Sequence, residues 1–306
     1  MMGVNKMADA YKKSEKGYKR GIMVHSIIRF IVCIILTIIC LLPLFIIVIN
    51  ATRSTNEIIN SAVSFVPSSH LIDNFKTLSD STVQNGFYTD NFNVWIGYRN
   101  SLIIAVSSTI LSVFFSALTA YGLTIYDFKL KKFATTFVLA VMMIPMQVVS
   151  VGFLQFMLKL KLYDNYLPLI LPAIAAPSVV FFMLQYMKSS FPVDIVEAAR
   201  IDGCGEFRTF LQIALPIFKP AFAVQAIFAF VASWNNFYTP NMILINNKFE
   251  QRTMPMMVAG VMGNLKLSDY GLNYLVIVLS ILPVVIVYLC LSKFIVKGVA
   301  LGAVKG

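Results

Sequence analysis

Charged residues divide this chain into long apolar stretches. Six stretches contain no Lys, Arg, Asp or Glu, and each is long enough to cross a bilayer as a helix, which takes about 20 residues. They span residues 30–52, 100–126, 133–158, 165–187, 220–247 and 270–292. The charge-free runs 58–72 and 253–265 are too short and are expected to be connectors. The pattern predicts an all-α membrane protein with six transmembrane helices.

The Lys and Arg residues between these stretches predict the orientation of the chain. With both termini in the cytoplasm, the inner connectors and ends carry 16 Lys and Arg residues and the outer connectors carry 8. Cytoplasmic segments are enriched in these cations. We therefore expect an N-in, C-in topology, with a cytoplasmic arm (1–25), a six-helix permeation domain (26–297) and a cytoplasmic tail (298–306). The first apolar run is longer than the core of a cleaved signal peptide, so it is interpreted as a retained helix.

Composition supports the membrane interpretation and excludes other classes. The chain is 58% hydrophobic and 13% charged, whereas soluble domains carry about 25% charged residues. Its net charge of +11 comes from connectors between apolar runs, so nucleic acid is not an expected partner. The four cysteines form no CxxC pair, and neither a disulfide nor a metal site is expected.

The segment 190–220 differs in chemistry from the other connectors. Ser190 is placed to cap a short helix whose first turn holds Asp194. Gly203 follows this helix, where a residue able to take positive φ is favoured. A second short helix is expected from Glu206 to about Pro216. We predict a cytoplasmic helix–turn–helix at the membrane surface.

The segment contains a set of fixed residues at fixed spacing, namely Glu197, Ala198, Ala199, Gly203, Ile213, Leu215 and Pro216. This set resembles the EAA loop through which ABC import permeases couple to their ATPases, and Asp202 and Pro220 extend the resemblance to the version found in carbohydrate importers. Cys204 departs from the usual alanine. Three pairs resemble the carbohydrate-permease pattern, namely Asn100–Ser101, Ala120–Tyr121 and Trp234–Asn235. The ending Gly298–Gly306, which contains Lys305, is similar to the tail of the shorter, second permease of maltose-type importers.

The resemblance implies a set of partners in a bacterial inner (cytoplasmic) membrane. These are a second permease subunit, two cytoplasmic ATPase subunits and an extracellular solute-binding protein. No GxxxxGK[ST] phosphate loop occurs in the chain, so ATP and Mg²⁺ are expected on the ATPases and no cofactor is expected here. Glu197 would meet a basic group on an ATPase, and Lys305 and Gly306 would approach the ATPase pair.

Polar and aromatic residues within the spans are candidates for the translocation path, because amide groups and aromatic faces suit sugar rings. They are Met143, Met146, Gln147, Ser150, Trp234, Asn235, Asn236 and Tyr238. Polar residues also hold membrane helices together, so packing is the competing interpretation for each.

Three alternative functions are compared with a sugar importer. An ion-coupled secondary transporter would place acidic or histidine relays within its spans, and the six runs contain none. An enzyme would need clustered catalytic groups, which the two separated histidines do not provide. A glycerol-phosphate importer shares much of the loop pattern but calls for a cationic site, and no Lys or Arg lies within the runs. A second permease could provide that cation, so this alternative stays open.

Overall fold

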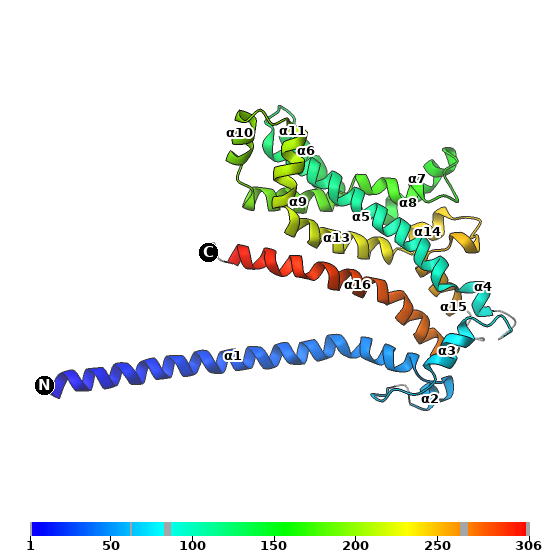
Figure 1. Ribbon diagram of the computed structural model, residues 1–306, viewed down its shortest axis with the longest axis horizontal. Coiled ribbons are helices and arrows are strands. Elements are labelled where there is room, and N and C mark those ends of the chain that lie inside the picture. The colour runs from blue at the N-terminus through cyan, green and yellow to red at the C-terminus, as the bar shows by residue number, and fades with distance from the viewer. Residues whose placement is uncertain (1, 62, 83–86, 264–268, 304–306) are drawn as a thin grey trace. The chain divides into compact units, whose positions relative to one another are not determined.

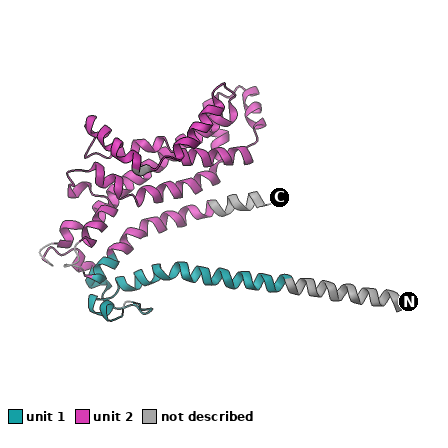
Figure 2. Cartoon of the chain, turned by 180° about the vertical axis from the view of Figure 1, so that it is seen from behind, with its two compact units in different colours: residues 1–74, 270–275 teal, residues 75–269, 276–306 magenta. Residues whose placement is uncertain are grey.

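A computed structural model of the chain is helical, with no strand among the residues it describes (Figure 1). These are residues 2–61, 63–82, 87–263 and 269–303, with side chains described except at 2–21, 146–147 and 295–303. The chain forms two compact units, residues 1–74 with 270–275 and residues 75–269 with 276–306 (Figure 2). The predicted all-α class is confirmed for the described residues.

The first unit is dominated by α1 (Met2–Ala51), followed by α2 (Thr55–Asn60) and the start of α3 (Leu71–Leu78). The apolar part of α1, Ile22–Ala51, has the length and hydropathy of a membrane span. Beyond its end, the buried Arg53 donates from Nη1 to Asn50 Oδ1 at 2.9 Å and to the Ser61 carbonyl at 2.8 Å, and from Nη2 to the Glu57 carbonyl at 2.7 Å. One guanidinium therefore serves three acceptors and joins the ends of α1 and α2.

The second unit is organised around α5 (Val94–Ile125), which packs along both α9 (Pro177–Ser190) and α13 (Lys219–Trp234). Small and hydroxyl side chains on α5 are buried in these contacts, which lets the helix backbones approach closely. The unit also contains α4 (Phe87–Asn91), α6 (Lys131–Met142), α7 (Met146–Lys159), α8 (Leu167–Ile170), η2 (Leu171–Ile174), α14 (Tyr238–Ile243), η4 (Phe249–Gln251), α15 (Met254–Met262) and most of α16 (Tyr270–Ala303).

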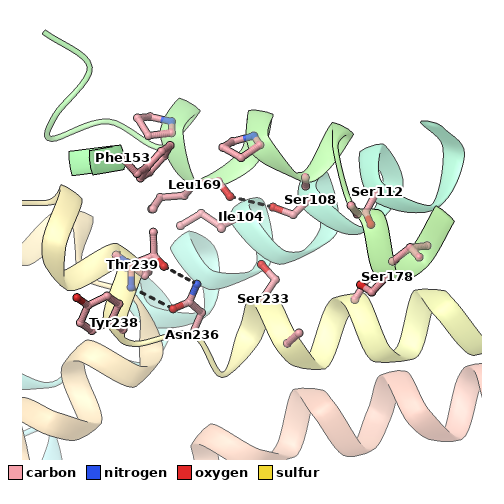
Figure 3. A pocket seen from close by; sticks show the side chains of 18 of the residues that line it. Ile104, Ser108, Ser112, Phe153, Leu169, Ser178, Ser233, Asn236, Tyr238 and Thr239 are labelled. Atoms are coloured by element: carbon pink, nitrogen blue, oxygen red, sulfur yellow. Dashed lines mark hydrogen bonds between the residues drawn. The ribbon is translucent and has the colours of Figure 1, made fainter. Parts of the chain in front are cut away.

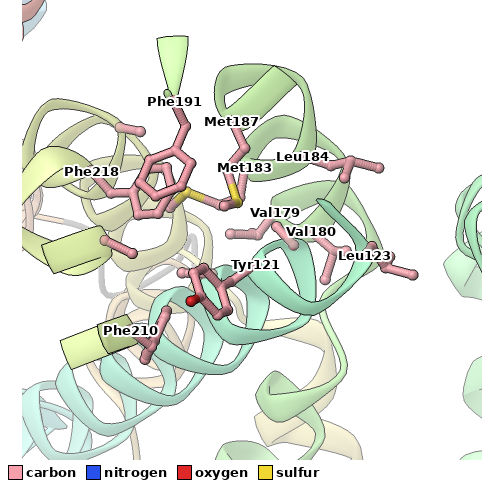
Figure 4. Packing of buried hydrophobic residues seen from close by; sticks show 14 of the residues in the cluster. Tyr121, Leu123, Val179, Val180, Met183, Leu184, Met187, Phe191, Phe210 and Phe218 are labelled. Carbon is pink, nitrogen blue, oxygen red and sulfur yellow. The ribbon is translucent and has the colours of Figure 1, made fainter. Parts of the chain in front are cut away.

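A buried aromatic cluster joins segment 190–220 to this helix core (Figure 4). Phe191 stacks on Phe218 with ring centroids 5.3 Å apart, and Tyr121 of α5 meets Phe210 at 5.3 Å. Met187 at the end of α9 is buried in the same cluster. Both ends of the segment are thereby fixed against α5 and α9.

Proline and helix breaks explain why the predicted spans are not six uninterrupted helices. Four helical segments of the described chain are long and apolar enough to span a membrane, namely Ile22–Ala51, Phe87–Ile125, Leu167–Ser190 and Tyr270–Phe294. A fifth candidate is a pair of helices, Glu206–Ile217 and Lys219–Trp234, bent by 81°. The predicted stretch 133–158 is divided into α6 and α7 at Pro145, which lacks an N–H to continue the helix. Six spans and the N-in, C-in orientation stay predictions.

Candidate functional site

The helix–turn–helix expected between 190 and 220 is present, and its turn is closed by a glycine C-cap. The first helix, α10 (Asp194–Ile201), ends two residues before Gly203, whose φ is +75°. The Gly203 N–H donates to the Arg200 carbonyl at 3.0 Å and the Cys204 N–H to the Ala199 carbonyl at 2.9 Å. This is the Schellman pattern, which requires positive φ at the residue that glycine occupies here. The prediction for Gly203 is confirmed.

The predicted cap at Ser190 is wrong. Ser190 is the last residue of α9, and α10 begins only at Asp194 without a side-chain cap. The reason lies in Phe191, which is buried in the aromatic cluster and has extended backbone. The residue before a proline is biased toward that conformation, so the break falls at Phe191–Pro192.

The second helix begins at the predicted residue and contains an irregular turn. It comprises α11 (Glu206–Thr209), the π-helical η3 (Phe210–Ala214) and α12 (Leu215–Ile217). The Leu215 N–H donates to the Phe210 carbonyl five residues earlier. Helical backbone continues one residue past the expected end at Pro216, after which the chain turns by 81° into α13.

A polar cluster holds the two helices to each other and to the end of α5. Arg200 Nε donates to Glu206 Oε1 at 2.7 Å, and the Tyr126 hydroxyl donates to Glu206 Oε2 at 2.7 Å. The hydrogen bond from Arg200 and then that from Tyr126 lower the pKa of Glu206. Sequence reasoning missed Tyr126 and Glu206, because nothing in the local pattern shows that residues 80 positions apart meet.

The matched EAA positions lie on the surface of this loop. Glu197, Ala198, Asp202 and Pro216 are exposed, Ile213 and Leu215 are half-buried, and Ala199 is buried. A hollow of about 430 Å³ opens between the two helices. It is lined by Ile195, Ala198, Ala199, Asp202, Gly203, Cys204, Arg208, Gln212 and Ile213. The loop therefore offers a recessed, partly polar surface.

A larger cavity, of about 640 Å³, lies within the second unit (Figure 3). Its walls come from α5, α7, α8, η2, α9, α13 and α14. Ile104, Ser108 and Ser112 follow one another at four-residue spacing on α5, so they share one helix face. On α13, Gln225, Phe228, Ala229, Ala232 and Ser233 form a second such face.

Three of the predicted path residues line this cavity. Ser150 and Tyr238 have their hydroxyl oxygens 3.1 Å apart, and Asn236 Nδ2 donates to Thr239 Oγ1 at 3.1 Å. Figure 3 shows Tyr238, Asn236 and Thr239 close together at one end of the cavity.

The remaining predicted path residues lie elsewhere. Trp234 is buried in helix packing, where Nε1 donates to the Ser280 carbonyl at 3.0 Å. Asn235 and Met143 are exposed and are not among the cavity-lining residues. The side chains of Met146 and Gln147 lie outside the described residues, as do Lys305 and Gly306.

The Asn100–Ser101 pair has a structural role at the opposite end of α5 from the loop. Asn100 Nδ2 donates to the carbonyls of Glu250 at 2.8 Å and Arg252 at 2.9 Å. Ser101 Oγ accepts a bond from the Met254 N–H at 2.7 Å. These side chains fix the connector between α14 and α15 on α5.

Comparison with known proteins identifies the family. The family described as "Binding-protein-dependent transport system inner membrane component" matches residues 112–301. The arabinooligosaccharides transport system permease protein of Halalkalibacterium halodurans is 34% identical over 274 residues, 88% of this chain and 92% of the relative. The chain belongs to this permease family.

Two further similarities support the family and its fold. The sn-glycerol-3-phosphate transport system permease protein of Salmonella typhimurium is 26% identical over 284 residues, 92% of this chain and 96% of the relative. A solved bacterial ABC transporter involved in the import of the acidic polysaccharide alginate aligns with a TM-score of 0.70 at 20% identity, covering 88% of this chain and 96% of that chain. The latter likeness establishes a shared fold.

Membership confirms the family inferred from the resemblance of residues 197–216. The permease family is a transport component of ABC importers and not an enzyme family. Its members are multi-pass membrane proteins, which agrees with the long apolar helices of this chain.

Proposed function

We propose that this permease forms one half of the translocation path of an ATP-driven importer for a neutral sugar or oligosaccharide. A second permease subunit would supply the other half of the path. Two ATPase subunits and an extracellular solute-binding protein would complete the complex, in the cytoplasmic membrane of a bacterium. The name of the arabinooligosaccharide relative supports this substrate class.

The chemistry of the 640 Å³ cavity is the observation that carries the proposal. Its volume is in the range of about 300–1,000 Å³ that is usual for ligand sites. No Lys, Arg, Asp or Glu is among the described residues that line it. Serine, threonine, tyrosine and amide side chains supply hydrogen-bonding groups, and Phe153, Phe228 and Tyr238 supply aromatic surface. Uncharged hydroxyl groups are the ligand groups that such a lining can satisfy.

This lining also favours a neutral sugar over a phosphate ester. A relative is named for glycerol-3-phosphate, and an anionic substrate needs a cation or converging backbone N–H groups when it leaves water. The described cavity residues of this chain provide no cation. Only a cation from the second permease would reverse this preference.

The loop 190–220 is the proposed contact with the ATPase. Glu197, Ala198, Ala199, Asp202, Gly203, Ile213, Leu215 and Pro216 would form the docking surface. Its attachment to α5 and α9 through the aromatic cluster gives a physical path by which ATPase closure would reshape the helices around the cavity. The tail residues Lys305 and Gly306 are proposed as a second approach to the ATPase pair.

Uptake by the complete complex in proteoliposomes tests this function. The permease would be purified with the second permease, ATPase and binding-protein subunits encoded beside it. Labelled arabino-oligosaccharide, lactose and sn-glycerol 3-phosphate would then be offered with ATP inside the liposomes. We expect uptake of a neutral sugar and none of the phosphate ester. Uptake of sn-glycerol 3-phosphate alone would overturn the substrate class.

A further inference from the structure

Four polar side chains that line the 640 Å³ cavity, those of Ser112, Ser178, Gln225 and Ser233, form no hydrogen bond to a described residue. Ser112 of α5 and Gln225 of α13 are 5% and 8% exposed, and Ser178 of α9 is exposed. Figure 3 shows Ser112 and Ser178 at the opposite end of the cavity from Tyr238.

Such groups are not explained by helix packing. Polar side chains that join membrane helices do so by hydrogen bonds between them. Ser108 is an example in the same wall, since its Oγ donates to the Leu169 carbonyl at 3.2 Å. Ser112 lies one helical turn further along α5 and makes no such bond. Buried polar groups of native proteins are normally satisfied. Ser112 and Gln225 are buried residues and Ser178 is exposed, and all three line the cavity, so their hydrogen-bonding partners must come from whatever occupies it.

We infer that Ser112, Ser178 and Gln225 form a binding site for the hydroxyl groups of a neutral sugar within this subunit. This inference rests on the proposed function and adds direct substrate contact to it. The Gln225 amide offers two donors and an acceptor, and each serine hydroxyl offers a donor and two lone pairs. That mixture matches sugar hydroxyls, which donate and accept at once.

The apolar part of the same wall completes the recognition. Phe228 lies three residues after Gln225 on the α13 face, and the residue is 65% exposed. A pyranose or furanose ring presents an apolar C–H face as well as its hydroxyl edge, and aromatic faces carry the negative potential that such C–H groups favour. Polar contacts on one side and a ring on another would fix the orientation of a sugar, as in other ligand sites.

Substitution of Gln225 in the complete complex tests the site. Gln225→Leu keeps the approximate size of the side chain and removes its hydrogen bonds. We expect KM for uptake of the neutral sugar preferred by the wild-type complex to rise about 5- to 10-fold, the effect of a lost hydrogen bond, with uptake at saturation retained. Ser112→Ala, a milder change, should raise KM about 2- to 5-fold. Gln155→Leu is the matched control, because Gln155 is an exposed α7 residue that does not line the cavity.

Monodeoxy analogues of the same sugar separate recognition from helix packing. If the Gln225 amide binds one hydroxyl, the analogue lacking that hydroxyl should show a KM that Gln225→Leu no longer changes. An unchanged KM for both Gln225→Leu and Ser112→Ala would overturn the site. The site would also be overturned if Gln225→Leu lowered the yield of assembled complex while the complex that still formed had an unchanged KM. That result would assign Gln225 to contact with the second permease. Absence of any sugar uptake by the wild-type complex would instead refute the proposed function itself.

Discussion

A substitution series at Gly203 distinguishes two properties of the turn proposed to contact the ATPase. These are the backbone conformation of the turn and the charge on its surface. Gly203 has a φ of +75°, and a Cβ added there would meet no atom within 4 Å. Space is therefore not limiting, and only conformation and charge can matter. A left-handed conformation costs an ordinary L-residue about 1–2 kcal/mol, whereas Asn and Asp are enriched several-fold in it.

The expected effect of each substitution follows from its cost in the left-handed conformation and from the charge it adds. Gly203→Ala should weaken the turn by about 1–2 kcal/mol, which is roughly a 5- to 30-fold shift between native and distorted turns. Gly203→Asn should lie near wild type. Gly203→Asp has the same shape as Asn but adds a carboxylate beside Asp202 on the surface proposed to meet the ATPase. Like charges brought together at an interface are costly, so Asp should uncouple transport.

The assay compares ATP hydrolysis with uptake in proteoliposomes. We expect Gly203→Asp to lose binding-protein-stimulated hydrolysis and uptake, while the variant still inserts and assembles with the second permease. Gly203→Asn should retain at least half of both activities. Wild-type uptake by Gly203→Asp would refute the docking role of the turn. Equal damage by Asn and Asp would show that charge is not the cause.

Four further predictions follow from the polar contacts. Reversing the charge of either partner, by Arg200→Glu or Glu206→Arg, should reduce binding-protein-stimulated ATP hydrolysis, because it breaks the Arg200–Glu206 ion pair. The double reversal should restore part of the hydrolysis, and a lack of restoration would refute the importance of this ion pair. The pKa of Glu206 is lowered, so its bonds to Arg200 and Tyr126 stabilise the loop fully above the ordinary carboxyl pKa and are lost as pH falls through the lowered value. Between pH 6 and 8 Glu206 therefore stays ionised, and its titration should not change the rate of ATP hydrolysis by the purified complex. A rate that followed the titration of Glu206 in that range would contradict this. Asn100→Ala should destabilise the complex by about 1–3 kcal/mol, measurable as a lower Tm, because the Arg252 carbonyl loses the Asn100 amide and the Glu250 carbonyl keeps only Arg99 as a donor. Arg53→Met should lower Tm as well, because three acceptors lose one guanidinium, and an unchanged Tm would contradict the network.

Local signals in the sequence were sufficient for the turn and for the positions of four long apolar helices among the described residues. Gly203 was predictable because a helix C-cap is a property of a few consecutive residues. Ser190 was not, since the burial of Phe191 among residues from α5 and the segment after η3 decides where α9 ends. The third span failed as a single helix for a reason visible in sequence, namely Pro145.

The cavity could be predicted only in part. Ser150, Asn236 and Tyr238 were found because polar residues stand out in apolar runs. Gln225 carries the same signal, as an amide within the fifth run, and could have been found. Ser112 could not, because α5 contains several serines and only the packing of α9 and α13 selects the face that stays open.

In the proposed complex, the exposed face of α10 meets the ATPase in the cytoplasm. The most direct measurement is labelling of Ala198→Cys, in a chain whose four native cysteines are replaced, by a membrane-impermeant maleimide. We expect no labelling in intact cells, labelling in inside-out vesicles stripped of the ATPase, and protection when the ATPase is restored. Labelling from outside the cell, or equal labelling with and without the ATPase, would contradict it.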